Sequence, residues 1–212
     1  MMIRVSFRTW ILLAAIGWAV TAGCANAPKP PPRFQLDPQQ AAQEALTLYD
    51  KKGDGTLDLK ELEASPPLLD LLRNLQAKSP GHPDSLTTAD IAGRLEEWRK
   101  DPATLLPGMA MVSLDDKPLQ GAIVTYKPEP FLGASFHSHQ GQTNAAGMVQ
   151  LTPEFEGYPG IYVGLYRICI SKMVNGKETL PARYNTETEL GREVAHDTRG
   201  SGTNIVFRLK SK

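Results

Sequence analysis

Acidic residues at short spacing carry the strongest chemical signal in the chain. They are Asp50, Asp54, Asp58 and Glu61. Gly55 stands among them, where it allows a sharp bend of the backbone. Carboxylates this close together repel one another unless a cation lies among them. Calcium is a hard cation that takes six to eight oxygen ligands, so residues 50–61 predict a Ca²⁺ site.

The order of residues in this segment resembles the calcium loop of an EF-hand, and the resemblance extends over residues 37–73. In that family, oxygen ligands occupy loop positions 1, 3, 5, 7, 9 and 12, with glycine at position 6. The ligands that the resemblance implies are Asp50, Asp54, Thr56 through its carbonyl, Asp58, and Glu61 with both carboxylate oxygens. The apolar residue of position 8, which forms a short strand in paired EF-hands, is Leu57.

Lys52 departs from the EF-hand pattern because it holds position 3, where an oxygen ligand is expected. The lost ligand and the added positive charge both predict weak calcium binding, and extracellular modules typically have a Kd of about 10⁻⁴ to 10⁻³ M. The alternative is that this Asp- and Gly-rich loop is a solvated turn that holds no metal.

Helices must flank this loop. Asp37 followed by Pro38 is a favourable helix start, and the helix that enters the loop presents Leu46 and Tyr49 on its apolar side. Prolines at positions 66 and 67 stop the helix that leaves the loop, and leucines between 68 and 75 predict a second amphipathic helix.

EF-hands usually occur in pairs, and residues 79–90 lie at the right distance for a partner loop. This segment keeps an apolar residue, Leu86, to pair with Leu57, and an acid, Asp90, at its final position. It lacks ligands at the early positions, so we expect a degenerate loop without metal. Apolar residues at helical spacing, Ile91, Leu95 and Trp98, predict a helix that packs back on the pair.

The N-terminus has the pattern of a signal peptide, with Arg4 and Arg8 before an apolar run at 10–20 that is too short to span a membrane. Residues 21–24, Thr-Ala-Gly-Cys, resemble a bacterial lipobox. The resemblance implies removal of residues 1–23 and lipidation of Cys24, with Ala25 favouring the outer membrane. Ordinary signal cleavage nearby is the alternative. Residues 24–36 are rich in proline and predict an extended tether between the membrane anchor and the folded part.

Charge and cysteine content limit the remaining functions. The chain has 23 basic and 23 acidic residues, and removal of residues 1–23 would leave 21 basic residues against 23 acidic ones. No basic run with interleaved aromatic residues occurs, which argues against a nucleic-acid partner. Of the 2 cysteines, Cys169 is interpreted as a small side chain on a strand if Cys24 carries lipid; a disulfide between them is the alternative.

Beyond Lys100, short β-rich runs separated by Gly, Pro and Asn replace the helical pattern. We predict strands at 109–114, 122–127, 148–152, 161–172 and 204–209. In the longest run, Tyr166, Ile168 and Ile170 alternate with less apolar residues, which is typical of a strand with one buried face. Such a set of strands over residues 107–212 predicts an antiparallel β-sandwich.

Three pieces of this region, 116–124, 143–151 and 159–168, resemble in their order a carboxypeptidase regulatory-like domain of the transthyretin-like type. The match covers residues 108–210 and implies a non-catalytic, surface-exposed fold. The segment 129–140 is longer than the family pattern has between its second and third strands.

One further cluster could carry metal chemistry. His137 and His139 would share a face of a strand and could then ligate zinc, copper or iron. No third ligand lies nearby in the sequence, so an exposed loop with two histidines is the simpler interpretation. A metal-dependent enzyme that uses this pair is therefore only a third hypothesis, and we expect no catalytic residue.

Together these observations predict an α+β protein of two domains. A helical EF-hand pair, one half degenerate, at 37–100 is followed by a β-sandwich at 107–212. The expected function is that of a lipid-anchored, calcium-binding protein of the cell envelope, with a further envelope protein or a glycan as partner. The alternative is a structural envelope lipoprotein whose EF-hand holds no metal.

Overall fold

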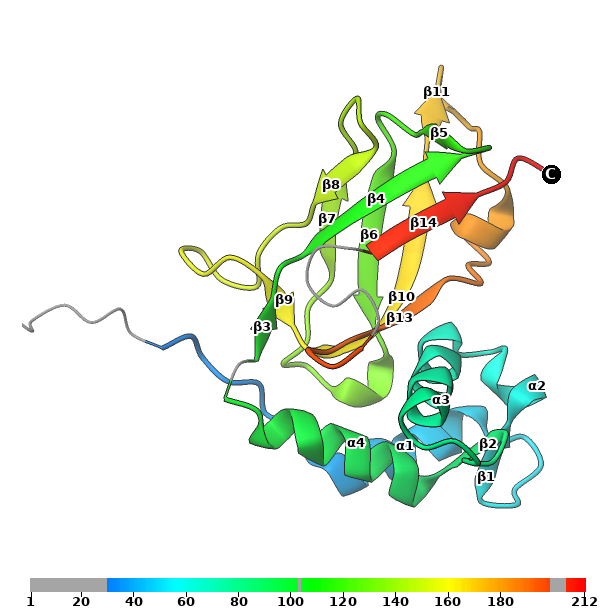
Figure 1. The fold of residues 1–212 in the computed structure, drawn as a ribbon, viewed down its shortest axis with the longest axis vertical. Helices are drawn as coiled ribbons and strands as arrows, with labels where there is room; N and C mark the ends of the chain where they lie inside the picture. The colour runs from blue at the N-terminus through cyan, green and yellow to red at the C-terminus, as the bar shows by residue number, and fades with distance from the viewer. Residues whose placement is uncertain (1–29, 103, 199–204) are drawn as a thin grey trace, which may run out of the picture. The chain divides into compact units, whose positions relative to one another are not determined.

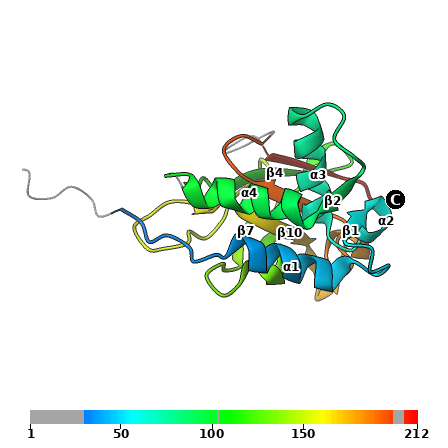
Figure 2. The same cartoon turned by 90° about the horizontal axis from the view of Figure 1, so that it is seen from below.

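The computed structural model describes residues 30–102, 104–198 and 205–212. The expected signal peptide, Cys24 and residues 25–29 of the expected tether lie outside the described residues. The rest of that segment, 30–36, is described, and its Phe34 is buried against Phe136 and Tyr162, so this end is packed on the fold and is not part of a free tether. Residues 31–212 form one compact unit of mixed α and β structure. Its helices gather at one end of the strands, as Figures 1 and 2 show.

The helices are α1 (Pro38–Tyr49), α2 (Leu59–Leu62), α3 (Pro66–Lys78) and α4 (Thr88–Lys100). The predicted start of α1 is confirmed, since the side chain of Asp37 accepts hydrogen bonds from the backbone N–H groups of Gln39 and Gln40. The prolines end the short α2 as expected, and α3 begins at Pro66 itself. Proline fits this place because the first helical residue needs no N–H donor.

The helices enclose a small two-stranded sheet of β1 (Thr56–Asp58) and β2 (Ser85–Thr87). Leu57 lies opposite Leu86 in the antiparallel register, which confirms the predicted pairing. Both side chains are fully buried, as are Ile91 and Leu95 of α4. Apolar residues at the centres of two short strands therefore hold the helices together.

The larger β part contains two main sheets. One has the order β13-β10-β6-β7, made of β6 (Ile123–Pro128), β7 (His139–Gln142), β10 (Gly164–Ser171) and β13 (Gly191–Val194). The other has the order β14-β4-β5, made of β4 (Met109–Leu114), β5 (Lys117–Pro118) and β14 (Ile205–Leu209), with β8 (Met148–Gln150) also paired to β4. Shorter pairs join β3 (Leu105–Leu106) to β9 (Ile161–Tyr162) and β11 (Met173–Val174) to β12 (Lys177–Glu178). Two single turns of 3₁₀ helix span Pro130–Leu132 and Ala182–Tyr184.

The alternation predicted for the longest strand is confirmed in β10. Tyr166, Ile168 and Ile170 are fully buried, while Cys169, a free thiol, is only half-buried. The expectation that the strands are antiparallel throughout is wrong for one pair, because β14 runs parallel to β4. The chain changes sheets between β13 and β14, so its last strand enters beside β4 in the same direction.

The helices pack directly on the β part. Gly191 of β13 lies so close to α3 that a Cβ at this position would be 2.1 Å from the backbone nitrogen of Pro67. Glycine is therefore required here by close approach of two backbones.

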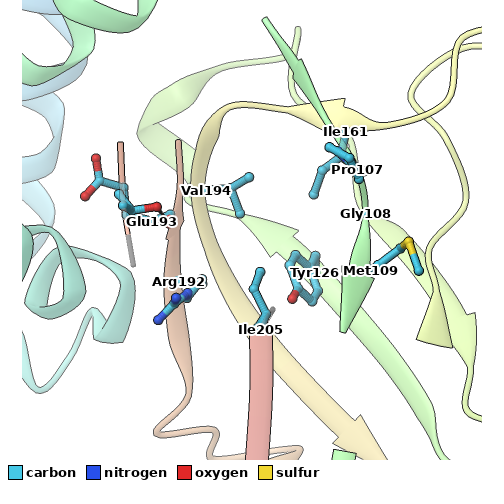
Figure 3. A pocket seen from close by; sticks show the side chains of 10 residues that line it. Pro107, Gly108, Met109, Tyr126, Ile161, Arg192, Glu193, Val194 and Ile205 are labelled. Atoms are coloured by element: carbon cyan, nitrogen blue, oxygen red, sulfur yellow. Dashed lines mark hydrogen bonds between the residues drawn. The ribbon is translucent and has the colours of Figure 1, made fainter. Parts of the chain in front are cut away.

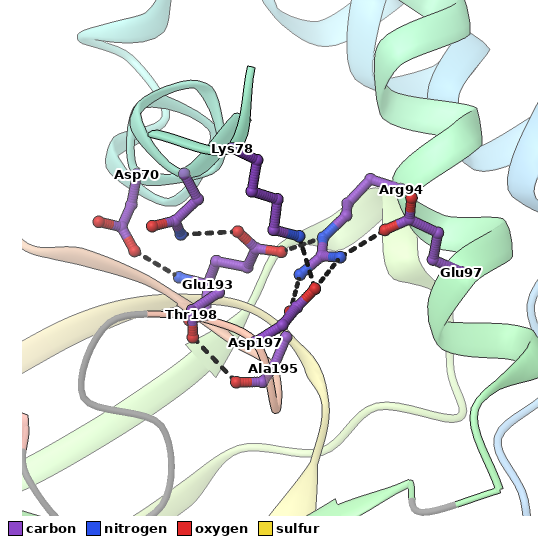
Figure 4. A network of polar contacts seen from close by, with 9 residues as sticks. Asp70, Lys78, Arg94, Glu97, Glu193, Ala195, Asp197 and Thr198 are labelled. Carbon is purple, nitrogen blue, oxygen red and sulfur yellow. Dashed lines mark hydrogen bonds and ion pairs between the residues drawn. The ribbon is translucent and has the colours of Figure 1, made fainter. Parts of the chain in front are cut away.

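A buried polar network lies at the same junction, as Figure 4 shows. Arg94 of α4 forms ion pairs with Glu193 of β13 and with Asp197, and Asn74 of α3 donates a hydrogen bond of 2.7 Å to Glu193. Hydrogen bonding to Arg94 holds the pKa of Asp197 below its usual range, whereas burial raises the pKa of Glu193 in spite of the nearby guanidinium. The helices and the sheets are thus joined by buried ion pairs, in which each charged group compensates the opposite charge of its partner.

Candidate metal centre

The segment with the acidic residues forms the loop between α1 and α2, with β1 inside it. Asp50 caps the C-terminus of α1, and Asp58 caps the N-terminus of α2. Gly53 and Gly55 adopt φ angles of 71° and 81°, in the left-handed region that glycine tolerates best. The bend expected at Gly55 is therefore present.

Two of the carboxylates fold the loop onto itself. Asp50 accepts hydrogen bonds from the N–H of Gly53 (2.6 Å) and of Gly55 (2.9 Å). The bond from Gly55 is the main cause that lowers the pKa of Asp50. Asp54 accepts bonds from the N–H and the hydroxyl of Thr56. These contacts bring N–H groups of residues 53–56 onto two of the loop carboxylates.

Glu61 connects the end of the loop to its beginning. One carboxylate oxygen accepts hydrogen bonds from the N–H groups of Lys51 (2.9 Å) and Lys52 (3.1 Å). The other accepts from the N–H of Asp58, whose side chain in turn accepts from the N–H of Glu61, a reciprocal capping box. Glu61 is buried, and it already faces the loop as a final ligand must.

Lys52 places a positive charge on one of the expected ligands. Its ammonium group forms an ion pair with Asp58, across the loop from position 3 to position 9. The hydrogen bond between them raises the pKa of Lys52 and lowers the pKa of Asp58. An ammonium group therefore supplies part of the positive charge that this set of oxygens requires.

The residues of the loop fit a calcium ion by the chemistry of their donors, which are oxygens on a loop turned by two glycines. In the structure, however, these carboxylates bind N–H groups and an ammonium group of the loop itself. In the part of the chain that the structure describes, no group of three or more His, Cys, Asp or Glu side chains is arranged to hold a metal ion. Binding would require Glu61 and Asp50 to exchange N–H donors for the cation, and Lys52 to leave Asp58.

The second loop, residues 79–90, ends in the same kind of capping box as the first loop, but with different side chains. Thr87 and Asp90 form a capping box at the start of α4, in the place that Asp58 and Glu61 hold at the start of α2. Asp90 also lies 3.4 Å from His82. Its carboxylate is engaged by a hydroxyl, an N–H and an imidazole.

The two histidines meet a carboxylate that sequence spacing did not reveal. His137 is exposed, but His139 begins β7 and is buried, so the interpretation of both as loop residues is wrong for His139. Glu154, 17 residues after His137, contacts both rings, at 3.0 Å from Nε2 of His139, and its side chain is inaccessible to solvent. The carboxylate lies between the two rings and forms an ion pair with each when the rings are protonated.

Tyr126 lines a small cavity between the sheets, shown in Figure 3. The cavity measures about 10 Å³, which is close to the space of one water molecule. The buried hydroxyl of Tyr126 has no hydrogen-bond partner among the described residues, and burial raises its pKa. This space is too small for an organic substrate.

Among the described residues, no helix is long and apolar enough to cross a membrane. Comparison of the chain with models of protein families, with curated proteins and with solved structures found no match in any of the three.

Proposed function

We propose that the protein is a non-catalytic, calcium-binding module of the cell envelope, in which the loop 50–61 binds Ca²⁺. The observation that carries this proposal is the pairing of Leu57 with Leu86, which joins the acidic loop to a second loop with the same capping frame. This arrangement supports the resemblance to an EF-hand pair more strongly than the spacing of the acidic residues alone.

Asp50, Asp54, Asp58 and Glu61 would supply side-chain oxygens, and Thr56 its carbonyl. Calcium would supply the positive charge that carboxylates at this spacing require. Because it binds the folded loop and not the unfolded chain, it stabilises the protein by mass action. Outside the cell, where calcium is abundant, such a site acts as a constant structural brace.

Calorimetric titration with calcium, combined with thermal unfolding, tests this proposal. We expect saturable binding and a rise of Tm in the wild type, and neither in Glu61→Gln. Glu63→Gln is the matched control, because Glu63 is an exposed acid two residues further along and carries the same charge. Equal calcium responses of all three proteins would contradict the assignment of the site.

A metal-free structural protein is the second candidate, and the Lys52–Asp58 ion pair favours it. In that case the ammonium group replaces calcium permanently. The same titration distinguishes the two, since this candidate gives no heat of binding and no change of Tm in the wild type.

The envelope location rests on the sequence at the N-terminus. We propose that Cys24 is lipidated after removal of residues 1–23, and that residues 107–212 are a transthyretin-like β-sandwich that faces an envelope protein or a glycan. Labelling of cells with a radioactive fatty acid should mark the wild type and not Cys24→Ser. Labelling of both proteins would place the anchor elsewhere.

A further inference from the structure

A buried carboxylate of the β part lies at the root of the acidic loop. Glu129 follows directly after β6, and its side chain is inaccessible to solvent. It accepts a hydrogen bond of 2.6 Å from the hydroxyl of Tyr49 and one of 2.8 Å from the hydroxyl of Ser65. These two partners come from opposite sides of the loop.

Tyr49 is the last residue of α1 and directly precedes Asp50. Ser65 is the N-cap of α3 and follows the end of α2 by three residues. One carboxylate therefore binds the segment that enters the loop with one oxygen and the segment that leaves it with the other.

Arg167 of β10 completes this arrangement. Its Nε lies 3.1 Å from Glu129, and its Nη2 donates to the hydroxyl of Tyr49 at 3.1 Å and to the backbone carbonyl of Ala64. The guanidinium thus contacts the same two segments as Glu129. The structure records no contact between this pair and the loop carboxylates. Its effect on them must therefore pass through the flanking backbone.

We propose that Glu129 and Arg167 are positioning residues for the calcium loop, which fix the distance between its entering and leaving segments. This inference rests on the proposed function of the loop. First and last ligands, Asp50 and Glu61, are carried by these two segments, so their separation decides whether both reach one cation. A loop that lacks the ligand of position 3 depends more on such positioning, because fewer oxygens remain to draw it together.

Coupling of this kind is reciprocal. If contacts with Glu129 favour calcium binding, calcium must strengthen the same contacts by an equal factor. The amide of Glu129 reports on this, since its N–H is bonded to the carbonyl of Leu165 within the β part. Calcium should therefore slow hydrogen exchange at a residue that is not part of the loop.

Tyr49→Phe and Ser65→Ala test the inference, because each removes one hydroxyl and no charge. With the purified full chain, calorimetric titration with Ca²⁺ should give a Kd raised about five- to tenfold in each variant, a typical size for coupling between sites. Calcium should also slow hydrogen exchange of the Glu129 amide in the wild type more than in Tyr49→Phe.

Asn74→Ala is the matched control, since Asn74 also donates a hydrogen bond from the helices to a buried carboxylate, Glu193, away from the loop. It should lower Tm without changing the Kd for calcium. A wild-type Kd retained in both Tyr49→Phe and Ser65→Ala would overturn the positioning role and leave the calcium site intact. Absence of calcium binding in the wild type would overturn the proposed function, and this inference with it.

Discussion

Lys52 forms an ion pair with Asp58 across the acidic loop, from the third position of the loop to the ninth. Calcium and this ammonium group compete for the same carboxylate. Lys52→Asn removes the competing charge and adds a side-chain oxygen, so we expect the Kd for calcium to fall by about tenfold or more. Calorimetric titration measures this change. Lys51→Asn serves as control, because the Lys51 ammonium group binds the carbonyl of Leu48 instead, and an equal gain in both variants would exclude a specific role of Lys52.

The pairing of Leu57 with Leu86 should contribute strongly to stability, since both side chains are fully buried. Leu86→Ala removes buried apolar volume and leaves a cavity, so we expect a loss of about 2–5 kcal/mol in the free energy of unfolding. Urea titration followed by circular dichroism gives this value. Leu48→Ala, at a position that is 41% exposed, should change it by less than about 0.5 kcal/mol. Similar losses in the two variants would mean that the two-stranded sheet does not hold the helices together.

Local patterns predicted the elements whose residues are apolar at a regular period. The run 109–114 coincides with β4, and the alternation predicted in 161–172 is found in β10. The prediction of a single strand over 161–172 is wrong, because the run is divided into β9 and β10. The helix start at Asp37 and the pairing partner of Leu57 could also be read from the sequence, because caps and short apolar strands have local signatures.

Long-range polar contacts could not be predicted in this way. The strands β7 and β13 of one main sheet were missed because their sequences are polar. The two-residue strands β3, β5, β11 and β12 were also missed, because runs this short have no period to recognise. Glu193 of β13 is buried and forms an ion pair with Arg94, 99 residues earlier in the chain. The partners of Glu129 and Glu154 are likewise brought to them by the fold, and no spacing of residues in the sequence predicts these contacts.

Removal of one partner from the buried network of Figure 4 should be costly. Arg94→Met leaves Glu193 as an unpaired buried carboxylate, and we expect a loss of about 3–5 kcal/mol in the free energy of unfolding. The double variant Arg94→Met with Glu193→Leu should recover much of this loss, because no buried charge then remains. Urea titration of the three proteins measures the coupling.

Arg99→Met is the control, because it breaks an exposed ion pair with Glu96 and should cost at most about 1 kcal/mol. If Arg94→Met lost no more stability than Arg99→Met, the network would be solvated.

Glu154 should make stability depend on pH. Burial alone would raise the pKa of this carboxyl group, but the contacts with His139 and His137 outweigh burial and hold the pKa below its ordinary value of 4.5. The folded state therefore binds this proton more weakly than the unfolded state does. The contribution of Glu154 to stability is complete above about pH 4.5 and is lost as the pH falls below that value.

Glu154→Gln removes the titrating group, and its urea midpoint should fall less than that of the wild type between about pH 7 and about pH 3. The exposed Glu156→Gln is the control and should keep the wild-type profile. If Glu154→Gln and the wild type lose stability in parallel over this range, the buried contact between Glu154 and the two histidines has no part in acid unfolding.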